Sequence, residues 1–361
     1  MTVPRTATTV FLSSARHVEL RETKLECMGD RSVWVKSRLS GISHGTEMAL
    51  YGGTAPQLAR PFDRTKRAFG PLEESQKIPS RALGYENVGE VMEVGLEVVS
   101  FKPGELVWCW APHTSSYVFE EGREGVGWPP TVGQYCFKLP PGVSPDEGVF
   151  TALTEVALTA IHDASVKVGD YVAVFGGGVI GLLCAQLAEL SGARNVFVSE
   201  PIQARRKRAE AFGAIPLDPT QADVSLSVRE QTQGRGADVS IEASGNQKAL
   251  HEAIRCTGLA GRVVTLGFYQ GGAPDVRFGE EWHLNRVSMR SSNSTWLCPS
   301  RHYPQWDITR SFETVLDLMV QKKLAVADMI THRIPFEQAP QAYELINERQ
   351  QEVLKVVLTY S

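Results

Sequence analysis

Three glycines in the middle of the chain have a spacing that suggests chemistry. The apolar stretch YVAVF runs into GGGVIG, so Gly176, Gly178 and Gly181 fit the pattern G-x-G-x-x-G, and LLCAQLAEL follows. The first glycine permits a tight turn, the second lets the backbone approach a pyrophosphate, and the third lets helix and strand pack closely. A helix that begins there presents backbone N–H groups to an anion. The pattern predicts a dinucleotide-binding turn, with Val179 and Ile180 among the residues that contact the cofactor.

An acidic residue follows at the distance expected in such a site. Glu200 ends the next apolar stretch, NVFVSE. A carboxylate there accepts hydrogen bonds from the ribose hydroxyls and repels a 2′-phosphate, which favours NAD over NADP. Arg205, Arg206, Lys207 and Arg208 could instead bind a 2′-phosphate, but on a helix they point to different faces. We therefore predict NAD as the cofactor, with Arg205 near it.

The elements that must position this turn are short apolar strands separated by helices. YVAVFG, NVFVSE, VSIEAS and RVVTLG are nearly continuous apolar runs, and GLLCAQLAELSG and QARRKRAEAFGA lie between them. This alternation is typical of a parallel sheet covered by helices on both faces. A capping box, Ser144 and Glu147, predicts that a helix begins just before this block. We predict a doubly wound Rossmann sheet over residues 150–292.

The flanking residues, 1–149 and 293–361, follow a different rhythm. Short β-like runs such as SVWVKSRLSGI, NVGEVMEVG, ELVWCWAP and GQYCFKLP are broken by Gly and Pro. Residues 54–80 are polar and interrupted by proline, which predicts a long loop with one short helix. Two helical patterns and the strand EVLKVVLTY complete the tail. A chain of 361 residues with this change of pattern is predicted to contain two domains.

Composition excludes several classes of function. The formal net charge is -4 and no basic block is present, which argues against nucleic-acid binding. No apolar run reaches the length of a membrane span, and the first residues lack the apolar core of a signal peptide, so we expect a cytoplasmic protein. The cysteines lack the spacing of a zinc knuckle or a disulfide framework, and we expect free thiols. They are Cys27, Cys109, Cys136, Cys184, Cys256 and Cys298.

The whole chain resembles the medium-chain dehydrogenase/reductase family, which includes zinc alcohol and polyol dehydrogenases. Ordered motifs carry the resemblance: GISHGTE, LGYENVGEVMEVG, FKPGELV, GGGVIG, GADVSIEASGN, AGRVVTLG and ITHRIPFEQAPQAYELI. The resemblance implies an α/β fold in which a Rossmann domain is inserted in a β-rich, GroES-like catalytic domain built from both chain ends. It also implies that Ser244 and Gly267, which lie in two of these motifs, contact the cofactor.

The residues at the family's zinc positions depart from its pattern. GISHGTE is one residue longer than the family motif and places Ser43 or His44 where a cysteine ligand belongs, while Tyr85 replaces a histidine ligand. The stretch that should hold four clustered cysteines for a structural zinc has none. Catalytic zinc needs about three protein ligands from Cys, His or carboxylate, so we predict no metal. A site of His44, Glu86 and Glu155 is the alternative.

Without zinc, a side chain must hold the substrate oxygen and move its proton. Tyr85, at a former ligand position, and His44, which titrates near neutral pH, are predicted to contact that oxygen. By resemblance, Thr46 matches the hydroxyl that begins the family's proton relay, and Glu86 matches an acidic residue near the metal ligands. Glu155 falls where the family packs the nicotinamide ring. The alternatives are a packing role for Tyr85 and a structural contact for Glu86.

These residues predict an NAD-dependent dehydrogenase that transfers a hydride between the nicotinamide and a secondary alcohol such as a sugar or cyclitol. A quinone or enone reductase of the same fold and a non-catalytic NAD(H) sensor are the alternatives. The resemblance also implies a homodimer or homotetramer formed through an edge strand of the Rossmann sheet, in RVVTLG or next to it. Some aromatic residues are expected near the substrate, where they would stack on a sugar ring or equally on a flat aromatic or tetrapyrrole. They are Trp110, Trp128, Trp282, His283, Trp296 and Trp306.

Overall fold

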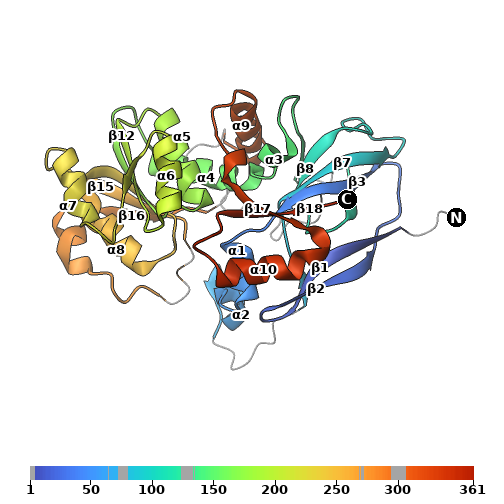
Figure 1. Ribbon diagram of the computed structural model, residues 1–361, viewed down its shortest axis with the longest axis horizontal. Coiled ribbons are helices and arrows are strands. Elements are labelled where there is room, and N and C mark those ends of the chain that lie inside the picture. Colours follow the sequence, from blue (N-terminus) through green and yellow to red (C-terminus); the bar gives the residue numbers. More distant parts are fainter. Residues whose placement is uncertain are drawn as a thin grey trace. The chain divides into compact units, whose positions relative to one another are not determined.

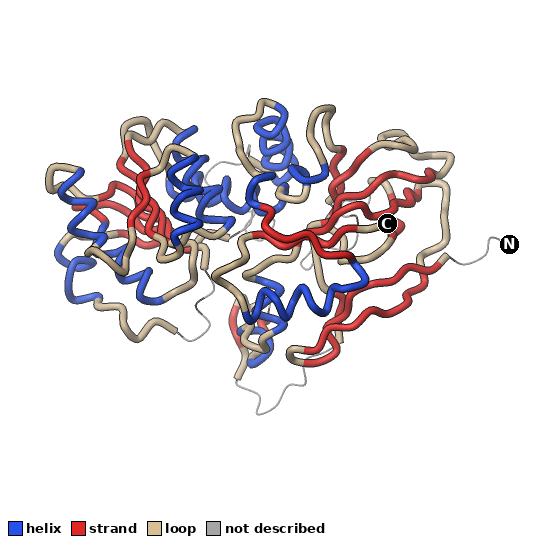
Figure 2. Tube along the Cα trace, in the orientation of Figure 1, coloured by secondary structure: helices blue, strands red, loops and turns tan. Residues whose placement is uncertain are grey.

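The chain divides into two compact units, one of which is built from two separate parts of the sequence. The computed structural model describes residues 5–63, 65–71, 80–122, 133, 135–267, 269, 272–293 and 306–361. The first unit comprises Met1–Thr151 and Val326–Ser361, and the second comprises Ala152–Ala325. Figure 1 labels many of the elements of both units, and Figure 2 colours their helices and strands differently.

The first unit is rich in strands. Its larger sheet has the order β10-β8-β7-β3-β18-β17, with β9 also paired to β3, and its smaller sheet has the order β2-β1-β6. β18 lies antiparallel to β3, with Val357 opposite Gly41, so two distant segments share one sheet. The strands are β1 (Thr6–Ser14), β2 (His17–Lys24), β3 (Ser32–Gly41), β6 (Arg81–Ala82), β7 (Asn87–Val94), β8 (Leu106–Cys109), β9 (Ser116–Glu120), β10 (Cys136–Lys138), β17 (Ile330–Pro335) and β18 (Lys355–Thr359), with a small separate pair, β4 (Phe62–Asp63) and β5 (Ala68–Phe69).

Short helices cover the sheets of the first unit. Tyr343 on α10 stacks on Tyr51 of α1 with ring centroids 5.7 Å apart, and both are buried. The short helix predicted in the 54–80 loop is α2, although residues 72–79 lie outside the described part of the chain. The predicted capping box is confirmed at α3. The helices are α1 (Thr46–Tyr51), α2 (Pro56–Ala59), α3 (Pro145–Gly148) and α10 (Ala339–Glu348), with single turns at Ala327–Met329 and Phe336–Gln338.

The second unit holds a six-stranded parallel sheet of order β13-β12-β11-β14-β15-β16. The chain runs outward from β11 in one direction and then returns to β14 beside it, which is the strand order of a Rossmann fold. β11 is buried at every position, as its continuous apolar sequence predicts. The strands are β11 (Tyr171–Phe175), β12 (Asn195–Ser199), β13 (Ile215–Leu217), β14 (Ala237–Glu242), β15 (Thr257–Thr265) and β16 (Ser288–Ser291).

Helices lie on both faces of this sheet. In Figure 1, α5 and α6 lie on one face, and α7 and α8 lie on the other. None of the helices in the described part of the chain has the length and apolar character that a bilayer span requires. The helices are α4 (Thr151–Ala164), α5 (Val179–Leu190), α6 (Gln203–Ala211), α7 (Val224–Gln231), α8 (Gln247–Cys256) and α9 (Ile308–Val320), with a single π-helical turn, η1 (Phe278–Trp282).

The second boundary between the units differs from the one expected at 292/293. β16 ends at Ser291, near that expected boundary, but the second unit continues through α9 to Ala325. Gln186 on α5 accepts a hydrogen bond from the backbone N–H of Ala325 at 2.8 Å, which ties the segment after α9 to the Rossmann helices. The first boundary, at 151/152, lies close to the expected 149/150.

The expectation that all six cysteines are free thiols is wrong for one pair. Cys109 on β8 and Cys136 on β10 form a disulfide, while Cys27, Cys184 and Cys256 are free. The two bonded cysteines are directly opposite each other in an antiparallel ladder. Residues opposed in this way bring their Cβ atoms close together. Their separation of 27 positions gives no such indication in the sequence.

Candidate functional site

The glycine turn of the second unit has the geometry that its sequence predicts. Gly176 has φ +100°, a conformation that strains any residue with a Cβ. A Cβ on Gly181 would lie 1.8 Å from the carbonyl oxygen of Gly176, so only glycine permits this approach of helix and strand. Gly178 caps α5 without a side-chain hydrogen bond, and Val179 and Ile180 begin the helix. The N-terminus of α5 thus has the form of an anion site.

Glu200 lies beside this turn. Its carboxylate accepts hydrogen bonds from the backbone N–H groups of Gly177, at 2.7 Å, and Ile202, at 2.9 Å. The Arg205 guanidinium is 3.9 Å from the same carboxylate. Arg206 pairs with Asp218 at 2.6 Å and donates to the backbone carbonyl of Glu200 at 2.7 Å. Of these two alternative contacts for a 2′-phosphate, Arg205 is the one whose guanidinium lies beside the Glu200 carboxylate.

The other predicted cofactor residues also come together at the ends of the strands. A Cβ on Gly176 would meet Ser244 at 2.9 Å, and one on Gly267 would lie 2.3 Å from Gly245. Glu242, at the end of β14 and fully buried, accepts hydrogen bonds from the Ser244 backbone N–H and hydroxyl and from the Tyr269 hydroxyl. These contacts hold the two loops together.

In the first unit, two hydroxyl groups meet at the positions expected for zinc ligands. Tyr85 donates a hydrogen bond to Ser43 Oγ at 2.8 Å, and Thr46 contacts the same phenol. The Tyr85 ring stacks on Trp110 with centroids 4.6 Å apart. Burial and then the neighbouring Glu86 raise the pKa of Tyr85 far above its usual range, so the phenol stays neutral. His44 lies in the same loop and is partly exposed.

Glu86 forms a buried ion pair with a lysine. Lys355 Nζ lies 2.6 Å from Glu86 Oε2 and donates a second hydrogen bond to the Ile42 carbonyl at 3.1 Å. Both charged side chains are at most 1% exposed. Burial raises the pKa of Glu86 to about 7, although Lys355 opposes the shift. A Cβ on Gly41 would lie 2.7 Å from Lys355 Nζ, so glycine makes room for the pair.

A second buried carboxylate, Glu47, lies in the first turn of α1. It accepts hydrogen bonds from the Ser43 backbone N–H at 2.8 Å, from His113 Nε2 at 3.0 Å and from the Tyr343 hydroxyl. Burial acts to raise its pKa, but His113 and the hydrogen bonds outweigh burial and hold the pKa below its usual range. Glu47 is therefore a carboxylate at neutral pH.

Glu155 lies on α4 and is fully buried in the second unit. Its carboxylate accepts a hydrogen bond from the Thr159 hydroxyl, one helical turn away, at 2.9 Å. The aromatic residues expected near a substrate have varied positions. Trp110 stacks on Tyr85, Trp282 packs against the core of the second unit, and Trp128 and Trp296 lie outside the described residues.

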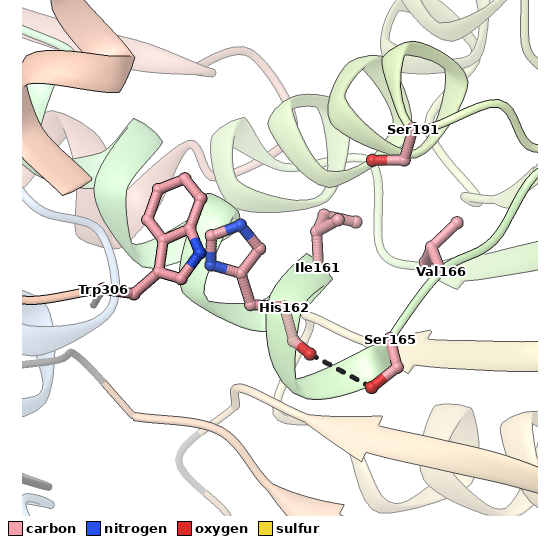
Figure 3. Close-up of a pocket in the computed structure, with 6 residues that line it drawn as sticks. All are labelled: Ile161, His162, Ser165, Val166, Ser191 and Trp306. Carbon is pink, nitrogen blue, oxygen red and sulfur yellow. Dashed lines mark hydrogen bonds between the residues drawn. The ribbon is translucent and has the colours of Figure 1, made fainter. Parts of the chain in front are cut away.

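A small cavity in the second unit is lined by Trp306, one of the aromatic residues expected near the substrate, but by none of the predicted catalytic or cofactor-binding residues. Figure 3 shows the His162 ring beside Trp306, with centroids 4.3 Å apart, and the Ser165 hydroxyl bonded to the His162 carbonyl. The cavity has a volume of about 180 Å³, below the usual range for a ligand site. Its lining residues are Ile161, His162, Ser165, Val166, Ser191 and Trp306.

The donor set around Tyr85 does not fit zinc. Catalytic zinc takes about three ligands from Cys, His or carboxylate. Ser43 and Tyr85 offer neutral hydroxyls that bond to each other, and Glu86 is paired with Lys355. In the described part of the chain, no three His, Cys, Asp or Glu side chains are grouped so that they could hold a metal ion.

Sequence reasoning missed several residues of these sites. Lys355 had a usable signal, because a lone lysine inside the apolar run VLKVVLTY predicts a buried partner of opposite charge. His113, Tyr343 and Tyr269 had none, since each meets its carboxylate only through the tertiary fold.

The two units, one β-rich and one with a Rossmann sheet and a glycine turn, define the fold class of the medium-chain dehydrogenases. Residues 179–310 match the family model described as zinc-binding dehydrogenase. The chain is 30% identical to (R,R)-butanediol dehydrogenase of Bacillus subtilis over 267 residues, which is 70% of this chain and 73% of that protein. The chain belongs to this zinc-binding dehydrogenase family, the medium-chain dehydrogenases/reductases, and is an oxidoreductase.

Two further comparisons agree over a longer span. D-guloside 3-dehydrogenase of Escherichia coli is 28% identical over 335 residues, or 91% of this chain and 93% of that protein. The crystal structure of 2R,3R-butanediol dehydrogenase from Bacillus subtilis superposes with a TM-score of 0.76 at 22% identity, and the match covers 98% of this chain and 99% of that one. This structural likeness confirms the predicted two-domain α/β fold.

Proposed function

We propose that the protein is a zinc-independent, NAD-dependent dehydrogenase that transfers a hydride between a secondary alcohol and the nicotinamide. The observation that carries the proposal is the Ser43–Tyr85 hydroxyl pair, at positions where the family holds metal ligands. The adjacent carboxylate, Glu86, is paired with Lys355. A site with this donor set can act through hydrogen bonds and proton transfer in place of a Lewis acid.

The side chains near Tyr85 have distinct parts in this chemistry. NAD⁺ held at the glycine turn and Glu200 would supply the acceptor for the hydride that leaves the alcohol carbon. Tyr85 stays neutral, keeps its proton in the hydrogen bond to Ser43 and accepts a hydrogen bond from the hydroxyl of the alcohol, with Thr46 and His44 beside it. Glu86, with a pKa of about 7, is the nearby group that takes up or releases a proton at neutral pH. Glu155 is proposed to pack near the nicotinamide.

Glu200 supports the choice of NAD. Its carboxylate is buried at the end of β12, next to the glycine turn, where it would accept hydrogen bonds from ribose hydroxyls. A 2′-phosphate would add negative charge beside it. Arg205 is close enough to offset part of that charge. We therefore propose a preference for NAD, with Gly176, Ser244 and the other loop residues around it.

The substrate class is proposed from the relatives and from one aromatic contact. The relatives' names describe dehydrogenases of a guloside and of butanediol, a sugar derivative and a diol. Trp110, stacked on Tyr85, offers an aromatic surface of the kind on which the C–H face of a sugar packs. We propose a sugar, a cyclitol or another cyclic secondary alcohol as the substrate.

We also propose a homodimer or homotetramer that forms through β16. This strand is the edge of the parallel sheet, and all four of its residues are exposed. An exposed edge strand offers unpaired backbone groups to a second copy. Sedimentation at micromolar concentration tests this point, since a monomer would contradict it. The cytoplasmic location expected from the sequence stays a prediction.

A panel of alcohols with NAD⁺ tests the proposed function. The panel holds sugars, polyols, cyclitols and aromatic alcohols, and the appearance of reduced nicotinamide is followed by its absorbance. Oxidation of a secondary alcohol is expected with NAD⁺, and more slowly with NADP⁺. Reduction of quinones or enones by NADPH without any alcohol oxidation would favour the reductase alternative. Binding of NAD(H) without turnover of any compound would favour the sensor.

A further inference from the structure

The hydroxyl of Tyr85 is held by Ser43. The Tyr85 O–H donates to Ser43 Oγ at 2.8 Å, and Ser43 is 4% exposed. The stack on Trp110 fixes the phenol ring, but a hydroxyl hydrogen still rotates about the C–O bond. The acceptor therefore decides where the Tyr85 proton and oxygen lone pairs point. Ser43 therefore sets the orientation of the Tyr85 hydroxyl, which is the group that the proposed chemistry uses.

Glu47 holds Ser43 from the other side. The Ser43 backbone N–H donates to Glu47 Oε1 at 2.8 Å, which closes the turn between the end of β3 and the start of α1. Glu47 is 2% exposed and carries a charge, so breaking its contacts would leave a buried carboxylate short of partners. The backbone from which the Ser43 side chain projects is thus fixed by a strong hydrogen bond.

His113 supports both partners of the Ser43–Tyr85 contact. Its Nε2 atom lies 3.0 Å from the Glu47 carboxylate that holds Ser43. Its ring also lies against Gly84, the residue before Tyr85, where a Cβ would come within 2.8 Å of the ring. Gly84 has φ +102°, so glycine permits both the turn and the close approach. One fully buried side chain therefore fixes the backbone on both sides of the hydroxyl pair.

The remaining contacts anchor His113. Its Nδ1 atom lies 2.7 Å from Ser40 Oγ, which lies 2.7 Å from the Tyr360 hydroxyl. Both ring nitrogens are thus bonded, and the ring cannot turn over without losing two hydrogen bonds. Tyr343 adds a further donor to Glu47 and meets the His113 ring edge-on at 6.4 Å.

We infer that Ser43, Glu47 and His113 are positioning residues that together set the direction of the Tyr85 hydroxyl. None of them needs to touch the substrate. The inference rests on the proposed function, because it assigns them a part in turnover by an alcohol dehydrogenase. A purely structural role would give the same contacts, so the test needs measurements that such a role would not change.

A double-mutant cycle on turnover is the first test. Ser43→Ala is expected to lower kcat by roughly 10- to 100-fold, with the KM for NAD⁺ within about twofold of wild type. Ser43→Thr restores a hydroxyl and should recover most of the rate. If Ser43 acts through Tyr85, the variant with both Ser43→Ala and Tyr85→Phe should be no slower than Tyr85→Phe alone. Additive losses would overturn the inference.

Ser37 provides the matched control. It is a fully buried serine of β3 whose hydroxyl has no hydrogen-bond partner in the described part of the chain. Ser37→Ala should leave kcat unchanged. An active wild type with an equally active Ser43→Ala variant would contradict this inference alone. Absence of turnover by the wild type over the whole alcohol panel would instead contradict the proposed function.

Two substitutions of His113 separate its contacts. Glutamine carries its amide near the position of Nε2 and can still donate to Glu47, whereas asparagine carries it near Nδ1 and keeps the contact to Ser40. Both remove the ring and should lower the melting temperature alike. His113→Asn is expected to lower kcat about tenfold more than His113→Gln. Equal rates for the two variants would overturn the role of the Glu47 contact.

Discussion

Two buried carboxylates in the first unit, Glu47 and Glu86, differ in their partners and in their pKa values. Glu47 is surrounded by hydrogen-bond donors, including His113, which hold its pKa low. Glu86 is paired with Lys355, and its pKa is about 7. The pKa values of the two carboxylates differ because more hydrogen-bond donors surround Glu47. Hydrogen bonds to the charged form of a carboxyl group favour its ionisation, whereas burial opposes it. Glu86 is thus the carboxylate of this pair that changes charge near neutral pH.

Replacement of Tyr85 tests the residue at the centre of the site. Tyr85→Phe removes only the hydroxyl, and kcat should fall by roughly 10²–10⁴ if that hydroxyl contacts the reacting oxygen. The melting temperature and NAD affinity should barely change, because the ring still stacks on Trp110. The readout is steady-state turnover of the best alcohol in the panel.

Tyr117→Phe is the control for that substitution. Tyr117 is also buried in the first unit, and its hydroxyl has no hydrogen-bond partner among the described residues. This variant should keep the wild-type rate. A Tyr85→Phe variant as fast as Tyr117→Phe would mean that Tyr85 only packs, and catalysis would then be sought at Glu86 or Glu155.

Loss of Lys355 should destabilise the protein strongly. Lys355→Met leaves Glu86 buried without its counter-charge, which costs about 3–5 kcal/mol of the free energy of unfolding. The variant that combines Lys355→Met with Glu86→Gln should recover most of that loss. Lys138→Met, which breaks an exposed ion pair with Glu105, should cost about 1 kcal/mol or less. Urea denaturation measures the free energy of unfolding of all three variants. Similar losses for Lys355→Met and Lys138→Met would contradict the idea that burial makes the Glu86–Lys355 pair costly to break.

The raised pKa of Glu86 also predicts a dependence of stability on pH. Its pKa moves from 4.5 to about 7 in the folded protein, so between these values the folded state binds more protons than the unfolded state. The free energy of unfolding of the wild type should therefore fall, relative to Glu86→Gln, as pH rises through this window. Urea denaturation at several pH values measures the difference, and a flat or rising difference would contradict the prediction.

At the residue scale, local motifs supplied part of the candidate site. Tyr85 and Glu86 stand next to each other in one motif, which made both of them candidates from the sequence. Lys355 lies 269 positions from Glu86, and nothing local joins them. The choice between Ser43 and His44 also depended on geometry, because a motif one residue too long leaves two candidates for one position. In the structure, the Tyr85 hydroxyl donates its hydrogen bond to Ser43.

Among the elements, the turn between β11 and α5 has the clearest functional form. Its glycines bring the backbone close to the ends of neighbouring strands, and the Glu200 carboxylate binds the Gly177 N–H. A carboxylate held in this way would already be oriented before the ribose of the proposed cofactor binds. Pre-oriented groups lose less entropy on binding.

Glu200 therefore predicts the cofactor preference. Glu200→Gln removes the negative charge and should narrow the ratio of NAD to NADP affinity by more than about tenfold, since a hydrogen bond to a charged group is worth roughly 1.5–3 kcal/mol. Glu210→Gln, at an exposed position of α6, is the control and should leave the ratio unchanged. Calorimetric titration with both cofactors supplies the affinities. Equal affinity of the wild type for NAD and NADP would refute the assignment.

The strands of the second unit were easier to predict from the sequence than the boundary at which that unit ends. β11, β12, β14 and β15 follow continuous apolar runs, and these runs arise because helices bury both faces of the sheet. The assignment of α9 depended on contacts made after folding, such as that between Gln186 and Ala325. The Cys109–Cys136 pair likewise follows from the register of two strands.

For the molecule as a whole, the side chains at the family's zinc positions predict that removal of metal ions changes neither activity nor stability. Protein dialysed against a chelator should keep its turnover and melting temperature, and metal analysis should find well below one zinc per chain. The physical reason is that hydroxyls and an ion-paired carboxylate bind zinc poorly compared with thiolate and imidazole. One tightly held zinc per chain, with activity lost on its removal and restored by its return, would contradict the proposed zinc independence.

The pairing of β18 with β3 has a consequence for the order of events during synthesis. Ser40 of β3 touches Tyr360, the residue just after β18, although the two are 320 positions apart, and Lys355 begins β18. At about 5–20 residues per second, a ribosome needs roughly 15–60 seconds to make the intervening chain. The whole Rossmann unit emerges in that interval, while the Glu86 carboxylate still lacks its cation. The unit begun first is thus completed last, and its nascent sheet must stay open until the final strand leaves the ribosome.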